Sequence, residues 1–326
     1  MYLKKIIPII GFIILIYILI NVDINKILID LSKINIFYLL LSIFAIFPVI
    51  LLSNYEWQLL LKKQKVKISY IKSLKNIFIG YFYGFISPGG YGAYARIFYL
   101  INDTKASIQK CFSNVILLNT LDYISLLIIG IFGVLILLNR SPDLINILIT
   151  IIIILILIIT IFILLMKKDL LKKLLIKIFK FKPINLLINE KKLLKFIDSF
   201  YEDFPKIKFL KIPFILSITG WFLQFFILFL IARLFSINID IISFIAIISI
   251  AKIFASIPIT IYGLGTREMA LIALFSLFNI IPEKIVSLSL FWFLIAWLIP
   301  SILGGLITIR EGYDKDIKNR NILIYK

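Results

Sequence analysis

The sequence contains no histidine and a single cysteine, Cys111. The lack of histidine excludes catalysis by an imidazole acid or base, and with one cysteine it also excludes a metal site built from several His and Cys ligands. One cysteine cannot form an intramolecular disulfide. We therefore expect neither a metal nor a cofactor at the functional site.

Acidic residues are scarce: 17 Asp and Glu stand against 36 Lys and Arg, which gives a net charge of +19. Such an excess raises the question of nucleic-acid binding, but no aromatic-rich basic RNA-binding module is visible. The lysines lie next to apolar runs instead, where they act as topology signals. Nucleic acid is therefore not an expected partner.

Apolar residues make up 62% of the 326 residues, with a mean hydropathy of +1.08, against about 45–50% in soluble domains. A soluble core cannot hide that much apolar surface. At roughly 20 residues per membrane helix, the chain has room for about eight spans. We predict an all-α polytopic membrane protein with a single membrane domain, residues 1–326.

Six continuous apolar runs predict membrane spans. They lie near residues 6–22, 36–55, 113–138, 144–166, 212–235 and 285–309. The first run follows basic residues as a signal peptide does, but it has no small-residue cleavage site, so we interpret it as an uncleaved span. Two more apolar regions, 77–100 and 241–281, are interrupted by Pro and Gly. Each is compatible with one span, two spans or a re-entrant hairpin.

The lysine distribution orients these segments. Six lysines and no acid lie between residues 62 and 75, and seven lysines lie between 167 and 182, which predicts that both stretches are cytoplasmic. Both termini are then cytoplasmic as well. Region 77–100 must begin and end inside, as a hairpin does. Region 241–281 must begin and end outside, as an outer hairpin or as two full spans.

With two hairpins, the second half of the chain repeats the first half upside down. The halves would be residues 1–140 and 141–310. This inverted-repeat plan is common in transporters, where broken helices meet near the midplane and form the substrate site. The pattern is also compatible with a homo-oligomer.

The two broken regions share a motif in which Pro is followed by Tyr-Gly and, four residues after that Gly, by Arg. Pro and Gly cannot sustain a helix, and an unwound backbone at membrane depth is tolerated only within protein or beside a watery cavity. The helix that resumes after the break presents free N–H groups that favour an anion. The candidate backbone positions are Pro88, Gly89, Gly92, Pro258, Gly263 and Gly265.

The arginines of this motif are Arg96 and Arg267. An arginine deep in a membrane costs about 2.5–3.5 kcal/mol and needs a carboxylate, a phosphate or an aqueous cavity. A lipid phosphate bound by both arginines in one cavity satisfies this need; the alternative is that each snorkels to the interface. Glu268 adjoins Arg267, and Asp122 is expected to pair with one of the arginines.

Lys252 lies about four turns into the run that starts near residue 240. It is either a phosphate ligand or a snorkelling inner anchor. Glu56 and Trp57 end the second span, where a Trp is most often an interfacial anchor. The stretch 167–211 alternates leucines with lysines at helical spacing, so we expect it to lie on the inner leaflet and to bind anionic lipids.

Four stretches of the chain resemble the family of lysylphosphatidylglycerol synthase transmembrane regions, a flippase-like membrane domain that occurs alone in many prokaryotes. They are YEWQLLLKK, SPGGYGAYAR, the Asp of NTLDYISLL, and IPITIYGLGTREMAL. The last stretch is similar to the family's Pro, Gly-x-Gly-x-Arg-Glu pattern and is the most specific. The first broken segment lacks the charged residues that the family usually has before its arginine, so the resemblance favours Arg267 as the site.

The resemblance implies a lipid transporter in the plasma membrane of a prokaryote, acting on anionic or polyprenyl-phosphate lipids. Fused members of the family carry a soluble aminoacyl-transfer domain after the membrane region, whereas this chain stops shortly after its last span, so lysyltransferase activity is not expected. Two alternatives remain. One is an enzyme that modifies a lipid head group, with Asp122, Glu268 and Glu56 as its few acid/base candidates. The other is a scaffold for cell-envelope enzymes.

Overall fold

A computed structural model describes residues 16–179, 190–256 and 263–311. Within these ranges the regular structure is helical, without a strand. Five helices are long and apolar enough to cross a membrane. They cover Ile36–Lys63, Ile108–Leu137, Pro142–Met166, Lys211–Leu234 and Pro282–Arg310. The predicted all-α polytopic membrane fold is confirmed, and five of the six continuous apolar runs coincide with these helices. Most of the first run, 6–22, lies outside the described residues.

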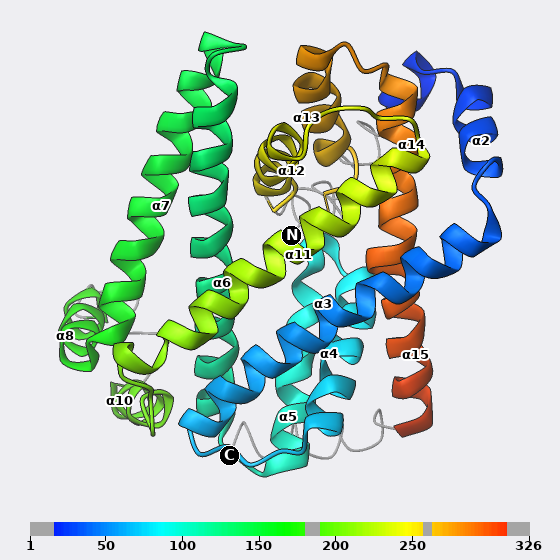
Figure 1. Cartoon of the computed structure of the whole chain (residues 1–326). Helices are drawn as coiled ribbons and strands as arrows, with labels where there is room; N and C mark the ends of the chain where they lie inside the picture. Colours follow the sequence, from blue (N-terminus) through cyan, green and yellow to red (C-terminus); the bar gives the residue numbers. More distant parts are fainter. Residues whose placement is uncertain (1–15, 180–189, 257–262, 312–326) are drawn as a thin grey trace.

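The long helices carry these labels in Figure 1: α3 (Ile36–Lys63), α6 (Ile108–Leu137), α7 (Ile145–Met166) and α11 (Lys211–Leu234). The last span consists of α14 (Pro282–Phe293), a π-helical turn η5 (Leu294–Leu298) and α15 (Ile299–Glu311). A short helix, α2 (Ile24–Ser32), packs against α14. The π-helical turn follows the sequence Leu-Ile-Ala-Trp-Leu, and its Trp297 faces a cavity that is described below.

The first broken region forms two helices joined by a tight turn. α4 (Tyr70–Phe85) is followed by a 3-10 helix, η1 (Pro88–Ala95), and by α5 (Arg96–Thr104). Gly90 has a φ of 72°, a conformation that glycine adopts without steric cost. A Cβ on Gly92 would lie 1.9 Å from the Tyr83 carbonyl oxygen, so η1 can fold back against α4 only with glycine at this position.

The second broken region has the same plan. α12 (Ile241–Ala255) and α13 (Thr266–Phe275) pack against each other. Gly263 has a φ of 77°, and a Cβ there would lie 2.5 Å from the Ala255 Cβ, so the returning chain touches the end of α12. With 15 and 10 residues, these helices rise about 22 and 15 Å. Neither is long enough to cross a hydrocarbon core of about 30 Å by itself.

The two broken regions lie at opposite ends of the molecule, α4 and α5 in the lower half of Figure 1 and α12 and α13 in the upper half. Each is held by the last span of the other half of the chain: α6 packs on α12, and α15 packs on α4. Glycine makes both crossings close, because a Cβ on Gly133 would lie 2.9 Å from the Ala246 carbonyl oxygen and one on Gly304 would lie 1.9 Å from that of Phe78. The two contacts are reciprocal, and the inverted repeat stays a prediction.

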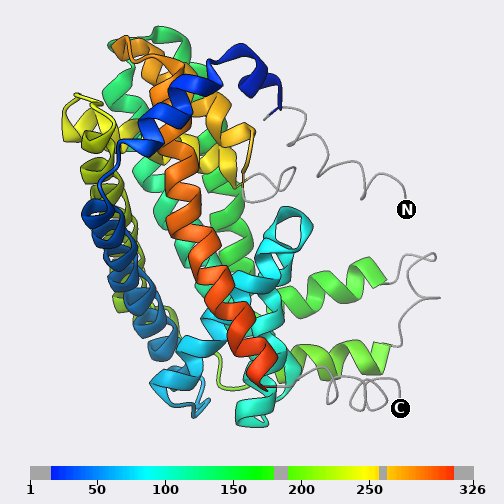
Figure 2. The same cartoon turned by 90° about the vertical axis from the view of Figure 1, so that its right-hand side faces the viewer.

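The described part of the basic stretch 167–211 includes the helices α8 (Lys168–Phe179) and α10 (Glu190–Phe200), which lie side by side near the lower end of the molecule (Figure 2). α10 packs against α6 and buries Ile197 and Phe200. Its apolar side is therefore at least partly covered by protein. Membrane contact of this stretch stays a prediction.

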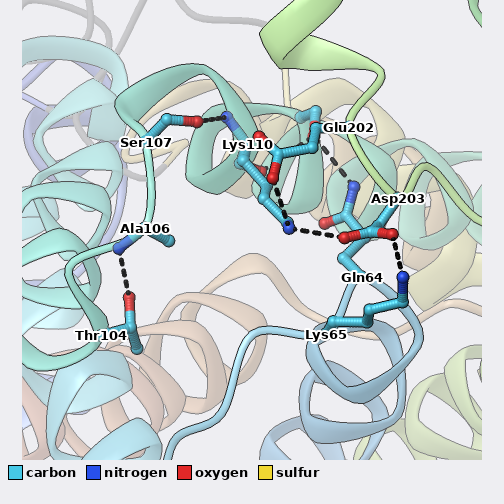
Figure 3. Close-up of polar contacts among 9 residues, drawn as sticks. Gln64, Lys65, Thr104, Ala106, Ser107, Lys110, Glu202 and Asp203 are labelled. Carbon is cyan, nitrogen blue, oxygen red and sulfur yellow. Dashed lines mark hydrogen bonds and ion pairs between the residues drawn. The ribbon is translucent and has the colours of Figure 1, made fainter.

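Asp203, just after α10, fixes this arrangement (Figure 3). Its carboxylate lies 2.6 Å from the Lys65 Nζ and 2.9 Å from the Lys110 Nζ. Hydrogen bonds from these two lysines hold the pKa of Asp203 below its usual value. The ion pairs connect the ends of α3, α6 and α10.

Candidate functional site

Arg96 is the first residue of α5, directly after the η1 turn. Its side chain lines a cavity of about 510 Å³. One guanidinium N–H donates to Asn119 Oδ1 on α6 (2.9 Å), and the Trp57 ring lies 5.2 Å from the Arg96 Cζ. The Arg96 Nε is buried and has no hydrogen-bond partner among the described residues, nor does a carboxylate there lie within ion-pair distance of this arginine. Its positive charge therefore faces the cavity without a direct counter-ion.

A chain of buried polar side chains holds Trp57 under Arg96. The Trp57 Nε1 donates to Asn114 Oδ1 (2.7 Å), the Asn114 amide donates to Gln64 (2.8 Å), and the Gln64 amide donates to Ser113 (2.9 Å). Trp57 is completely buried. The prediction of an interfacial anchor was wrong, because the partners of Trp57 lie within the protein and not at the membrane surface.

Lys252 lines the same cavity from α12. Its Nζ lies 5.6 Å from the centre of the Trp221 ring and 4.7 Å from that of Trp297, which are cation–π distances. The described residues supply neither a hydrogen bond nor an ion pair to its ammonium group. Arg96 from the α4–α5 region and Lys252 from the α12–α13 region thus bring two cations to one cavity.

Asp122 on α6 is the acidic residue of this cavity's lining. Its Oδ1 accepts a hydrogen bond from the Ser217 hydroxyl (2.7 Å), and its carbonyl oxygen accepts one from the Trp221 Nε1 (3.1 Å). No arginine among the described residues lies within ion-pair distance of Asp122, so the predicted ion pair with an arginine is wrong; both of these hydrogen-bond donors come from α11. Asp122 lines the same cavity as Arg96 but does not pair with it.

Arg267 and Glu268 at the start of α13 form a buried ion pair. The Arg267 Nη2 lies 2.6 Å from Glu268 Oε1, and the Arg267 Nε donates to Ser289 Oγ on α14 (2.8 Å). The other carboxylate oxygen of Glu268 accepts from the Gly265 N–H (2.6 Å), which caps the helix. Gly265 has a φ of 87°. The charge of Arg267 is thus already neutralised within the protein.

The two arginines do not face one cavity. Arg267 lines a separate space of about 40 Å³, whereas Arg96 lines the cavity of about 510 Å³. Lys252 and Trp297 line both. The expectation of a single cavity shared by both arginines is corrected accordingly, and the open site is the one at Arg96, not the one at Arg267 that the sequence favoured.

The candidate glycines and prolines shape the turns that carry these arginines. Pro88 and Gly89 belong to η1, and the Gly92 N–H donates to Ser87 Oγ (2.6 Å). Pro258 lies outside the described residues. Gly263 and Gly265 flank the start of α13 with positive φ angles.

Aromatic residues form a large part of the cavity wall. They are Tyr81, Tyr91, Tyr94, Tyr123, Trp221 and Trp297. Sequence reasoning did not single out this set, because its members come from η1 and from four separate helical segments. The Tyr94 hydroxyl accepts a hydrogen bond from Asn119 (3.1 Å) and so belongs to the polar network around Arg96. Of these six residues, only Tyr91 belongs to the Tyr-Gly-x-x-x-Arg motif found in the sequence.

The family model described as "Lysylphosphatidylglycerol synthase TM region" matches residues 6–304. The chain belongs to this family. It is also 27% identical to a UPF0104 membrane protein of Methanocaldococcus jannaschii over 335 aligned residues, which cover 96% of each chain. The resemblance found in the broken segments is confirmed, and family membership together with the apolar helices identifies a multi-pass membrane protein with a lipid-related function.

Proposed function

We propose that this family member moves lipids with a phosphate-containing head group across the membrane, and that Arg96 and Lys252 bind the phosphate. The proposal rests on the surroundings of these two cationic side chains. Both line the cavity of about 510 Å³, and neither forms an ion pair with a carboxylate of the described residues.

Phosphate suits this site for chemical reasons. A guanidinium presents several N–H donors in a fixed plane, and a phosphate oxygen accepts such bonds strongly. The Arg96 Nε is free to donate. The backbone N–H of Arg96 already donates to the Ala93 carbonyl of η1, so the guanidinium and not the start of α5 supplies the donors. The aromatic wall suits the glycerol or isoprenoid carbons next to the phosphate.

The transport step follows from the arrangement of the broken regions. Because the α4–α5 pair and the α12–α13 pair enter from opposite ends, movement of one against the other changes the side from which the cavity opens. The acyl or isoprenoid chains stay in the bilayer. The termini are cytoplasmic in this proposal, the membrane is the plasma membrane of a prokaryote, and the lipid is anionic or a polyprenyl phosphate.

An acid/base role for Glu268 receives no support from its contacts. One carboxylate oxygen binds Arg267 and Ser289, and the other binds the Gly265 N–H. A general base must have an oxygen within reach of a substrate proton. Arg267 and Glu268 instead stabilise the second hairpin in its compact form.

The test is a flip assay in vesicles of phosphatidylcholine and phosphatidylglycerol that contain fluorescent phosphatidylglycerol, with quencher added outside. We expect Arg96→Ala and Lys252→Ala each to lower the flip rate at least tenfold, the effect of losing about 1.4 kcal/mol of binding. Arg140→Ala is the matched control, since Arg140 is exposed and stacks on Phe278 away from the cavity. Equal rates for all four folded proteins would refute the proposal.

Mass spectrometry of the same vesicles addresses the enzyme alternative. Transport leaves the lipid covalently unchanged. A lipid product whose head group has gained or lost mass, formed by the wild type and not by empty vesicles, would favour the head-group-modifying enzyme.

A further inference from the structure

A second cavity, of about 380 Å³, lies where the chain leaves α3 and where it enters α6. It shares no lining residue with the Arg96 cavity. Four lysines and one acid line it, and no aromatic side chain does. The charged residues of this lining are Lys65, Lys67, Lys105, Lys110 and Glu202. Such a wall suits a small, hydrated, negatively charged ligand and not a lipid chain.

Two of the four lysines are already paired and two are not. The Nζ atoms of Lys65 and Lys110 lie 2.6 and 2.9 Å from the carboxylate of Asp203 (Figure 3). Lys67 and Lys105 are exposed, and neither forms a hydrogen bond or an ion pair with a described residue. Asp203 and the one acid of the lining compensate two of the four ammonium groups. Two positive charges are therefore left uncompensated.

The backbone at the start of α6 adds donors to the same wall. α6 begins at Ile108, and its N-cap Ser107, which lines the cavity, accepts a hydrogen bond from the Lys110 N–H. The N–H groups of Ile108 and Gln109 have no acceptor among the described residues. Unpaired N–H groups at a helix start, together with the positive end of the helix dipole, favour an anion. They reinforce the attraction of the two free lysines.

We propose that this cavity binds a phosphate group between Lys67, Lys105 and the start of α6. A lysine ammonium group binds phosphate as a point charge, and two of them match the charge of a phosphate dianion. Two sources share this chemistry, an anionic lipid head group of the adjacent leaflet and free phosphate on the side that loop 62–75 faces. The site is independent of the proposed transport, because it uses none of the residues of the Arg96 cavity.

The test is hydrogen exchange, followed by mass spectrometry, of peptides that cover residues 104–110 in the full-length protein. A bound phosphate gives the Ile108 and Gln109 N–H groups the acceptor that they lack. With the ligand at about ten times its dissociation constant, exchange should slow about tenfold, because only the ligand-free fraction exchanges. Inorganic phosphate added to phosphatidylcholine nanodiscs tests the free anion. Nanodiscs that also contain phosphatidylglycerol, without added phosphate, test the head group.

Two double variants show whether the protection comes from this cavity. Lys67→Gln with Lys105→Asn removes both free lysines and should abolish the protection; Asn tolerates the φ of 56° at position 105. Because neither lysine has a described partner, the fold should persist. Lys206→Gln with Lys211→Gln removes the same charge from exposed positions outside the cavity and should keep the protection.

Each outcome decides a point. Protection by inorganic phosphate supports the site and makes free phosphate a ligand, whereas protection by phosphatidylglycerol alone supports the site and makes the ligand a lipid head group. No protection with either probe would overturn the proposal. Equal protection in both double variants would also overturn it, since it would show only a diffuse attraction of anions to a basic protein. A protein that flips lipid without this protection would refute the site and leave the proposed function standing.

Discussion

Buried charges differ in what surrounds them, and this difference separates the structural residues of this protein from the candidate ligands. Arg267 is 7% exposed and has a carboxylate at 2.6 Å. Arg96 has an amide and an aromatic ring as partners, and Lys252 has two rings. In a low-dielectric interior the first arrangement is already neutral, whereas the second favours an added anion.

Glu268→Gln is expected to destabilise the protein, because it leaves the Arg267 charge buried without its counter-ion. Breaking a buried pair in this way costs about 3–5 kcal/mol. The midpoint of thermal unfolding in detergent should therefore fall by many degrees. The matched control is Glu283→Gln, which removes the partner of the more exposed Lys26 (3.3 Å) and should cost no more than about 1 kcal/mol. Equal losses in both variants would contradict the structural role of the Arg267–Glu268 pair.

Lys252→Met is expected to maintain or raise the stability of the protein and to abolish lipid transport. It removes an ammonium group that lacks a carboxylate partner in the described structure, so thermal stability should stay the same or increase, while lipid flip is lost. Such an exchange of stability for function is typical of residues that serve a ligand.

Lys110→Met is the comparison for this experiment. Lys110 is paired with Asp203 at 2.9 Å, so its loss should lower stability. If Lys252→Met destabilises the protein as much as Lys110→Met does, the lysine has a structural partner and is not a free phosphate ligand.

At the scale of elements, the helices α4 and α12 of the broken regions are each held by a long apolar segment through a glycine contact. α15 crosses α4 at Gly304, and α6 crosses α12 at Gly133. A close approach of two backbones needs small residues in a membrane, where no hydrophobic effect drives helices together. The helix pairs that carry Arg96 and Lys252 are therefore positioned by the last span of the opposite half.

Gly304→Ala and Gly133→Ala are expected to lower stability by about 1–3 kcal/mol each, as overpacking does. Gly220→Ala is the control, because its added Cβ would meet only Leu52 Cδ2 at 3.8 Å. Alanine exceeds glycine in helix propensity by about 1 kcal/mol, so the control should be neutral or stabilising. Denaturation midpoints of the three variants distinguish these outcomes, and a Gly304→Ala variant as stable as Gly220→Ala would contradict the close crossing.

The position of α10 depends on Asp203. Because Lys65 and Lys110 lower the pKa of this carboxyl, its contribution to stability is present above the pKa of the unfolded chain, about 3.9, and is lost as the pH falls through the lower folded pKa. Asp203→Asn imitates the loss at neutral pH. Faster hydrogen exchange of α10 amides is expected in Asp203→Asn. Asp198→Asn, which removes only the pair with Lys168, should leave the α10 contact with α6 protected.

At the scale of the whole molecule, the two broken regions lie at opposite ends, which predicts that they face opposite sides of the membrane. Cysteine labelling with an impermeant reagent in intact cells tests it, in a background where buried Cys111 is replaced by Ala. Ser236→Cys and Asn279→Cys flank the α12–α13 pair and should react from outside. Lys67→Cys and Lys105→Cys flank the α4–α5 pair and should react only after the cells are opened. All four residues are exposed. Reaction of either pair from both sides would contradict the proposed topology.

Sequence by itself determined the spans, the breaks and the family. Apolar runs long enough to cross a bilayer, lysine-rich loops, and Pro and Gly within apolar regions are local signals, and each predicts structure without knowledge of distant contacts. Five predicted runs correspond to long helices, and the positive φ angles of Gly263 and Gly265 lie where the pattern placed a break.

Only the tertiary structure decided which charges are free. Arg267 meets Ser289, Arg96 meets Asn119 and Asp122 meets Ser217, at separations of 22, 23 and 95 residues. Such partners depend on how helices cross in three dimensions, and a local sequence pattern does not predict a crossing. For this reason the sequence favoured Arg267, whose motif is the more specific, whereas packing neutralises that arginine and leaves Arg96 facing the cavity.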